Sequence, residues 1–258
     1  MSRLVGVLVL VLTFGSSQAA LVTKTIEYKH GDTILEGYLA YDDAVQGKRP
    51  GVLVVHERMG LNDYAKMRAN MLAELGYAAF AVDMYGKGVR PKNAQEAGQT
   101  AAIYRNDRQL MRGRVRAGLE TLRSQEMVDP ARIAAIGYCF GGGVALELAR
   151  SGADIAGVVS FHGNLDTPNP DDAKNIKAKV LVLHGASDPY VTPEIVNAFW
   201  NEMNNAGVDW YMVAYGNAVH SFTNPASGND PSQGVAYNEK ADHRSWEAMK
   251  QFFDEIFK

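Results

Sequence analysis

One short segment constrains the fold of this chain more than any other, because it joins a strand, a sharp turn and a helix. The apolar run Arg132–Ile136 predicts a strand, Gly137–Gly141 (Gly-Tyr-Cys-Phe-Gly) a sharp turn, and Gly142–Arg150 a helix. Small residues must flank such a turn, since bulkier ones would collide in the bend. The turn lifts the thiol of Cys139 off the end of a sheet strand. It also places the backbone amide of Phe140 at a helix N-terminus, where it can hold a developing oxyanion.

The rest of the chain alternates strand-like and helix-like segments. Further strands are predicted at Gly51–Val55, Tyr77–Val82, Ile155–Phe161, Lys179–His184 and Asp209–Tyr215, and further helices at Asn62–Leu75, Pro193–Ala206 and Glu239–Phe257. Thr23–Lys29 and Thr33–Tyr41 predict an N-terminal hairpin, and the polar stretch Asn93–Gln125 predicts one or two surface helices with a break near Arg105–Asp107. This order predicts an α/β fold with a mostly parallel central sheet and helices on both faces.

The N-terminus has the pattern of a secretory signal. Arg3 supplies positive charge, Leu4–Phe14 is an apolar run, and Gly15–Ala20 is a small-residue cleavage region. We therefore expect a signal peptide over residues 1–20 and an exported, periplasmic protein. The remainder, residues 21–258, is expected to form one α/β domain without a membrane span. An uncleaved anchor or a first buried strand is the alternative interpretation of the apolar run.

The charge balance and the cysteine count restrict the classes of partner. The formal net charge is −3 and the sequence pI about 6.1, which gives no sign of binding to nucleic acid or to an anionic membrane surface. An exported chain with one cysteine can form no internal disulfide. Cys139 therefore either pairs between chains or stays free for chemistry, and its place on the turn favours the second. A monomer is the default expectation, and a dimer stays open.

Three residues that follow predicted strands have the types and the order of a catalytic triad. Ligands bind beyond the carboxyl ends of the strands in an open α/β sheet, and Cys139, Asp188 and His220 each follow a strand. The order nucleophile, acid, histidine is that of α/β-hydrolases. His220 could take the thiol proton and Asp188 could orient the imidazole. The alternatives are that Cys139 is an apolar filler, that Asp188 caps the helix near Pro193, and that His220 is a surface residue.

The other histidines are weaker candidates for chemistry. His30 lies in the hairpin turn and His243 in the last helix, whereas His56 and His184 close apolar strands and are expected to be buried and hydrogen-bonded. His162 follows a strand and could border a pocket. No pair of histidines has a metal-ligand spacing, so we expect neither a metal nor a cofactor.

The sequence resembles the dienelactone hydrolase family of α/β-hydrolases. The resemblance extends from the Thr23 hairpin to the final helix. The motifs that carry it are Val54–Glu57 with Gly60–Asn62, Asp83–Gly86, Gly137–Gly141, His184–Asp188 and His220–Phe222. The resemblance implies that a Cys-His-Asp triad hydrolyses a small ester or lactone through a thioester intermediate. It further implies that the Glu57 carboxylate bonds the resting thiol and that the backbone amides of Phe140 and Arg58 form the oxyanion hole.

Two positions depart from the family pattern. Where the family holds a substrate carboxylate with two arginines, this chain has Lys87 and Asn224. A lysine binds a carboxylate only as a point charge, and an asparagine brings no charge. Arg58 is a candidate for the missing charge, and Tyr85 and Phe222, together with Phe140 and Phe161, are expected to line an apolar pocket. A binding protein with a vestigial site and a thiol redox sensor are the competing functions.

Overall fold

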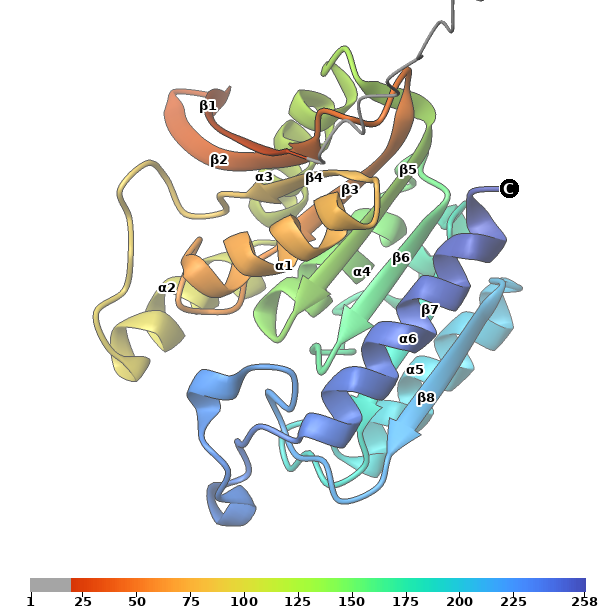
Figure 1. Ribbon diagram of the computed structural model, residues 1–258. Coiled ribbons are helices and arrows are strands. Elements are labelled where there is room, and N and C mark those ends of the chain that lie inside the picture. The colour runs from red at the N-terminus through yellow and green to blue at the C-terminus, as the bar shows by residue number, and fades with distance from the viewer. Residues whose placement is uncertain (1–19) are drawn as a thin grey trace, which may run out of the picture.

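One mixed β-sheet organises the molecule. In the computed structural model, which describes residues 20–258, the strands lie in the order β1-β2-β4-β3-β5-β6-β7-β8 (Figure 1). Their bounds are β1 (Leu21–His30), β2 (Thr33–Asp42), β3 (Arg49–Val55), β4 (Ala78–Val82), β5 (Val128–Tyr138), β6 (Gly157–Phe161), β7 (Lys179–Gly185) and β8 (Trp210–Tyr215). The predicted signal segment lies, except for Ala20, outside the described residues.

The sheet is parallel except at one edge. Strands β1 and β2 form the predicted hairpin around Gly31, and β2 also pairs antiparallel with β4. From β4 to β8 all neighbouring strands are parallel. The prediction of a mostly parallel sheet is therefore confirmed, and the N-terminal hairpin extends this same sheet.

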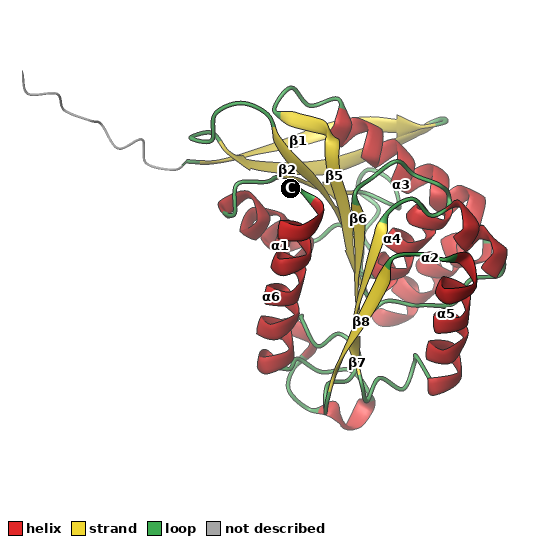
Figure 2. Ribbon diagram, turned by 90° about the vertical axis from the view of Figure 1, so that its right-hand side faces the viewer, coloured by secondary structure: helices red, strands yellow, loops and turns green. Residues whose placement is uncertain are grey.

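Helices cover both faces of the sheet. The α-helices are α1 (Asp63–Glu74), α2 (Ala94–Asn106), α3 (Arg108–Arg123), α4 (Phe140–Arg150), α5 (Pro193–Ala206) and α6 (Glu239–Ile256), and short 3-10 helices lie at η1 (Pro170–Asn175), η2 (Pro225–Ser227) and η3 (Pro231–Gln233). Figure 2 shows α1 and α6 on one face and α2 to α5 on the other. Within residues 20–258, none of the helices combines the length and the apolar character that a membrane span needs.

Helix boundaries follow the capping residues that the sequence offers. The side chain of Asn62 accepts a hydrogen bond from the Ala65 amide and begins α1 as predicted. Asp107 lies between α2 and α3, where its carboxylate accepts from the Leu110 amide at 2.9 Å and caps α3. This confirms the predicted break.

The sheet separates two apolar layers. In β3, Val52 and Val54 pack toward α1 and α6, whereas Leu53 and Val55 pack toward α3 and α4; all four side chains are fully buried. A strand covered on both faces needs this continuous apolar sequence. Each such side chain contributes about 1.5–3 kcal/mol of transfer free energy.

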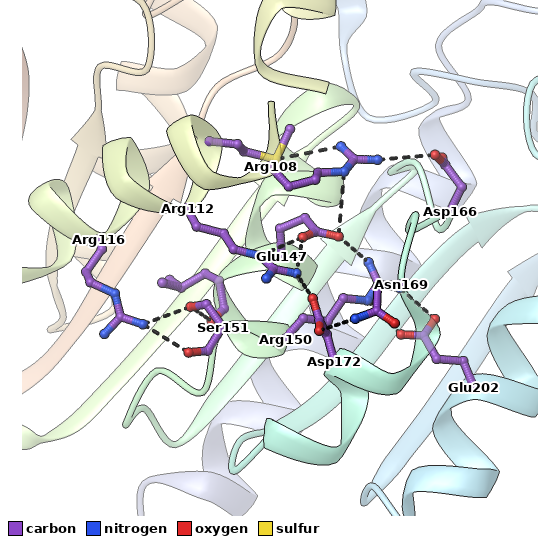
Figure 3. Close-up of polar contacts among 12 residues, drawn as sticks. Arg108, Arg112, Arg116, Glu147, Arg150, Ser151, Asp166, Asn169, Asp172 and Glu202 are labelled. Carbon is purple, nitrogen blue, oxygen red and sulfur yellow. Dashed lines mark hydrogen bonds and ion pairs between the residues drawn. The ribbon is translucent and has the colours of Figure 1, made fainter. Parts of the chain in front are cut away.

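A buried ion-pair cluster fixes α4 against its neighbours (Figure 3). The Arg150 guanidinium on α4 donates to both carboxylate oxygens of Glu202 on α5, at 2.7 and 2.8 Å. Glu147, one turn earlier on α4, accepts from Arg112 on α3, and Arg112 also pairs with Asp172 of η1. Since α4 begins directly after Cys139, these ion pairs fix the C-terminal end of the helix that follows the cysteine turn.

The strand order reverses between β3 and β5. The chain passes from β3 outward to β4 and then returns to place β5 on the other side of β3. A crevice forms at such a switch point beyond the carboxyl ends of the strands. Glu57 follows β3 and Cys139 follows β5, so both residues lie at this crevice.

Candidate active site

The turn that carries Cys139 has the strained backbone of a nucleophile elbow. Cys139 has φ 54° and ψ −117°, a conformation that side chains with a Cβ rarely adopt. A Cβ atom at Gly137 would lie 1.9 Å from the Gly141 oxygen, and one at Gly141 would lie 2.3 Å from the Val55 oxygen. The expectation that small residues must flank the turn is therefore confirmed.

Hydrogen bonds join Cys139, His220 and Asp188 in one chain. The Nε2 atom of His220 lies 3.0 Å from the Sγ atom of Cys139, and its Nδ1 atom lies 2.8 Å from Oδ2 of Asp188. The second oxygen of Asp188 accepts from the Tyr190 amide at 2.8 Å. Asp188 does not cap the helix that begins at Pro193, since Thr192 occupies the N-cap position of that helix.

The surroundings of His220 make it a strong base. Burial by itself lowers the pKa of His220, but the adjacent Cys139 sulfur and the hydrogen bond to Asp188 outweigh burial and raise this pKa to about 10. A histidine with such proton affinity favours transfer of the thiol proton to nitrogen. The contact between Sγ and Nε2 therefore gives the thiol proton a direct path to a basic nitrogen.

The Glu57 carboxylate is held by the loop that follows His220. Its Oε1 accepts from the Ser221 hydroxyl at 2.9 Å and its Oε2 from the Asn224 amide at 2.6 Å. The family resemblance implied a bond from Glu57 to the resting thiol. Instead, within residues 20–258, the Cys139 sulfur pairs with His220 and both Glu57 oxygens face Ser221 and Asn224. Burial raises the pKa of Glu57, and these two hydrogen bonds oppose the rise.

The two backbone amides expected to form the oxyanion hole have no acceptor in the described part of the chain. Among the hydrogen bonds of residues 20–258, the amides of Phe140 and Arg58 donate to no protein group. Tyr85, expected to line the pocket, instead lies behind this loop and donates its hydroxyl to the Arg58 carbonyl at 3.0 Å. Its ring packs against Phe140. Tyr85 therefore supports the loop that presents the Arg58 amide.

These groups open into a pocket of about 500 Å³, a size that suits a small ligand. Its lining residues come from six regions of the chain, and they are Glu57, Arg58, Met59, Asn62, Arg105, Cys139, Asn164, Tyr190, His220, Ser221, Asn224, Ala226, Ser227 and Val235. Cys139 is buried, with only 6% of its surface exposed at the base of the pocket.

Lys87 and Phe222, both expected at the pocket, lie elsewhere, and the buried side chains of Phe140 and Phe161 do not line it either. The Lys87 ammonium is turned toward the N-terminal hairpin, where it pairs with Glu27 and with Glu36. The hydrogen bond to Glu27 raises the pKa of Lys87. Phe222 is fully buried and packs against His162 and Tyr215 in the core beneath the pocket. Both expectations are corrected. Ion pairs with the N-terminal hairpin hold Lys87 away from the pocket, and the loop after His220 directs Phe222 into the core.

Asn224 lines the pocket as expected, but its side-chain amide is already engaged with Glu57. Sequence reasoning missed Arg105 and Tyr190. Arg105 lies in the last turn of α2, and Tyr190 packs edge-on against the His220 ring at 5.3 Å. The signal for Tyr190 was its place two residues after Asp188, whereas only the folded position of α2 reveals Arg105.

His56 and His184 are both buried as expected, but of these two only His56 has a hydrogen-bond partner within residues 20–258. His56 accepts from the Met84 amide at 3.3 Å, and burial lowers its pKa to about 4. Burial likewise lowers the pKa of His184. Within residues 20–258 no group of three or more potential metal ligands comes together.

Comparison with known proteins places this geometry in a family. The sequence model described as Dienelactone hydrolase family matches residues 35–257. The chain belongs to the dienelactone hydrolase family. It is therefore a hydrolase with the α/β-hydrolase fold, as the strand order and the cysteine turn indicate.

Individual proteins are similar to this chain over most of its length. A solved structure named m3DLH is 45% identical and covers 93% of this chain and all of its own, with a TM-score of 0.89. A dienelactone hydrolase-like promiscuous phosphotriesterase from metagenomic libraries is 43% identical over 92% of this chain and 99% of its own, with a TM-score of 0.88. A carboxymethylenebutenolidase from a Pseudomonas species is 30% identical over 71% of this chain and 78% of its own.

Proposed function

We propose that this hydrolase cleaves small carboxylic esters or lactones, with Cys139 as the nucleophile, His220 as the general base and acid, and Asp188 as the residue that orients His220. The observation that carries the proposal is the unbroken hydrogen-bond chain from the Cys139 sulfur through His220 to Asp188 at the base of a pocket. The substrate class follows from a thiol nucleophile beside free backbone amides, because acyl transfer uses a nucleophile together with donors that bind the oxyanion.

Acylation begins with a proton transfer. The Cys139 proton passes to Nε2 of His220, and the thiolate attacks the carbonyl carbon of the substrate. A C–S bond forms, and the carbonyl electron pair moves to oxygen. The amides of Phe140 and Arg58 stabilise that oxyanion. Collapse breaks the C–O bond, and the leaving oxygen takes the proton from His220, so that a thioester remains on Cys139.

Deacylation repeats the same steps with water. His220 accepts a proton from water, and the hydroxide attacks the thioester carbonyl. The C–S bond then breaks and the sulfur recovers its proton from His220. The net reaction adds one water and yields an acid and an alcohol, or an open-chain hydroxy acid when the substrate is a lactone.

Glu57 supports this machinery electrostatically in our proposal. Its carboxylate is bound to Ser221, the residue next to His220, and interacts favourably with a protonated His220. A buried negative charge near His220 stabilises the imidazolium that forms when the thiol loses its proton. Ser221 and Asn224 keep that carboxylate in place.

We also propose that the substrate bears an anionic group bound near the mouth of the pocket. Arg58 and Arg105 both line the pocket, and both side chains are exposed. Of the arginines in residues 20–258, Arg58, Arg105 and Arg244 are those whose side chains make no hydrogen bond or ion pair to protein. A guanidinium without an internal partner can bind a carboxylate in bidentate fashion.

Hydrolysis of a small panel tests the proposal. The panel contains a lactone, neutral p-nitrophenyl esters of rising chain length, a carboxylate-bearing ester and one phosphotriester, the last because of the metagenomic relative. Turnover by the wild type that disappears in Cys139→Ala supports a cysteine hydrolase. No turnover by either protein, or equal turnover by both, would refute it. Mass spectrometry of the acylated wild type, with one acyl group on Cys139, identifies the intermediate.

The location in the cell is a separate proposal. We propose that residues 1–20 direct export and are removed. Expression of the full chain in a bacterium, followed by N-terminal sequencing of the protein recovered from the periplasm, tests it. A chain that begins near Ala20 supports export with cleavage, and a chain that stays in the cytoplasm with its N-terminus intact contradicts it.

A further inference from the structure

Strained backbone conformations concentrate around the candidate active site. Among residues 20–258, the non-glycine residues with positive φ are Cys139, His162, Asn217 and Ser221. Asparagine and histidine adopt this region more often than most residues, but it is uncommon for any residue other than glycine. Cys139 is the proposed nucleophile and Ser221 follows the proposed base. His162, with φ 39°, is the third strained residue, and the mechanism so far gives it no role.

His162 contacts both segments that carry the reacting groups. Its Nδ1 atom accepts from the Cys139 backbone amide at 3.1 Å, an amide that also donates to the Phe161 carbonyl. Its Nε2 atom lies 2.7 Å from the hydroxyl of Thr223, three residues beyond His220. The ring meets the His220 ring edge-on, with centroids 5.4 Å apart. The side chain is fully buried and does not line the pocket.

The far end of this connection is anchored in the helix layer. The Thr223 hydroxyl also bonds the Tyr64 hydroxyl at 2.6 Å, and the Thr223 carbonyl accepts from Arg68 at 2.7 Å. Arg68 in turn pairs with Asp242 of α6 at 2.6 Å. The loop after His220 is therefore fixed to α1 and α6, and His162 connects that fixed loop to the nucleophile turn.

From these contacts we infer that His162 is a positioning residue, which together with Thr223 sets the separation of the Cys139 sulfur from the His220 ring. It acts through the Cys139 backbone and the His220 loop and touches no reacting atom.

The hydrogen-bond directions determine which ring nitrogen of His162 carries the proton. Since the Cys139 N–H donates to Nδ1, that nitrogen carries no proton, and Nε2 bears the hydrogen that Thr223 accepts. Burial lowers the pKa of His162 well below its ordinary value, and the nearby charges of His220 and Arg68 lower it further. The imidazole therefore keeps the neutral form that both hydrogen bonds require.

Thr223→Val and Thr223→Ser are the matched test pair. Valine preserves the shape of threonine but removes the hydroxyl, and serine keeps the hydroxyl. In Thr223→Val we expect kcat/KM to fall about tenfold through kcat, with little change in KM, because small displacements of reacting groups are costly. We also expect the pH profile of Cys139 alkylation by iodoacetamide to move to higher pH. Thr223→Ser should restore both.

His162→Asn provides a second, independent test. Asparagine adopts positive φ and its Oδ1 can accept from the Cys139 amide, but it is too short to reach Thr223. We expect it to shift the alkylation profile in the same direction as Thr223→Val, and the double variant to be no worse than Thr223→Val alone, since both changes remove the link between His162 and Thr223. Additive losses would overturn the inference.

Loss of stability alone must be separated from a change in positioning. Val159→Ala in β6 removes buried side-chain volume without removing any hydrogen bond of the network, and lowers Tm by cavity formation. If Val159→Ala shifted the alkylation profile as much as Thr223→Val, or if Thr223→Val and Thr223→Ser had the same profile, the inference would be overturned. The inference rests on the proposed roles of Cys139 and His220. Alkylation needs no substrate, so a failure of the hydrolase proposal and a failure of this inference are distinguishable.

Discussion

The Nε2 atom of His220 lies 3.0 Å from the Sγ atom of Cys139, although the two residues are 81 positions apart in the chain. The parallel sheet creates this proximity, because the carboxyl ends of β5, β7 and β8 open on the same edge. A sulfur at this distance from a basic imidazole can lose its proton before substrate is attacked.

Cys139→Ser tests whether the site depends on that thiol. The variant should fold normally, since serine is smaller and hydrogen-bonds equally well. We expect kcat/KM to fall by roughly 100-fold or more, because an alcohol ionises far less readily than a thiol and the pair is set up to form a thiolate. Steady-state kinetics on the best ester of the panel measure it, with circular dichroism as the control for folding. A serine variant with near wild-type turnover would contradict the thiolate mechanism.

The sequence predicted the elements whose signals are local. The break at Asp107, the cap at Asn62 and the glycine-flanked turn at Cys139 each rest on the chemistry of one or two residues, and all three are found. Cys139, Asp188 and His220 were predicted from chain order alone, and the structure joins them by hydrogen bonds.

Side-chain directions could not be predicted because they depend on neighbours distant in sequence. Lys87 is drawn away from the pocket by acidic residues of the hairpin, more than 50 positions earlier. Arg105 lines the pocket from the last turn of α2, and only the folded position of that helix brings it there. The bond between Glu57 and Asn224 spans 167 positions. No local pattern encodes such contacts.

Glu57→Gln should stabilise the protein more at high pH than at low pH. Burial raises the pKa of Glu57 in the folded protein. A carboxyl of this kind favours folding below its unfolded-state pKa, and that contribution is lost as the pH rises through its folded-state pKa. Glutamine cannot ionise and so escapes the loss. Thermal denaturation at pH 4 and at pH 8 should therefore show a gain in Tm for the variant that grows with pH, alongside lower activity. The exposed Glu74→Gln is the control for removal of one charge, and a gain that shrinks with pH would refute the argument.

Two glycine-to-alanine changes should have opposite effects on the free energy of unfolding. At Gly141 a Cβ would lie 2.3 Å from the Val55 oxygen and 2.6 Å from the His56 oxygen, and backbone atoms cannot yield. We expect Gly141→Ala to cost at least about 3 kcal/mol or to prevent folding. Gly98 in α2 is exposed and has no atom within 4 Å of the same position. Gly98→Ala should stabilise by about 0.5–1 kcal/mol. Urea denaturation of both measures the contrast, and equal effects would mean that the turn can relax.

The ion-pair cluster of α4 predicts a large loss of stability from a change distant from the pocket. Arg150→Met would leave Glu202 without its buried partner and Glu147 with fewer cations, which costs about 3–5 kcal/mol. Adding Glu202→Leu removes the unpaired carboxylate and should recover much of that loss. Urea denaturation of the two single variants and the double variant measures the coupling. Because the cluster does not line the pocket, KM should stay near the wild-type value in each variant that folds, and a coupling energy near zero would show that Glu202 finds another partner.

Arg105→Gln should reduce the preference for anionic substrates. The comparison uses two p-nitrophenyl esters of equal length, one ending in a methyl group and one in a carboxylate. We expect the ratio of their kcat/KM values, anionic over neutral, to fall about three- to tenfold, the loss appropriate to one exposed charge contact. High salt should lower the same ratio in the wild type. Arg244→Gln is the matched control, since Arg244 is also exposed and without a protein partner but lies at a shallow surface depression beside Tyr215, away from the pocket. An equal change in Arg244→Gln would attribute the effect to net charge, and no change in Arg105→Gln would mean that substrate does not contact this arginine.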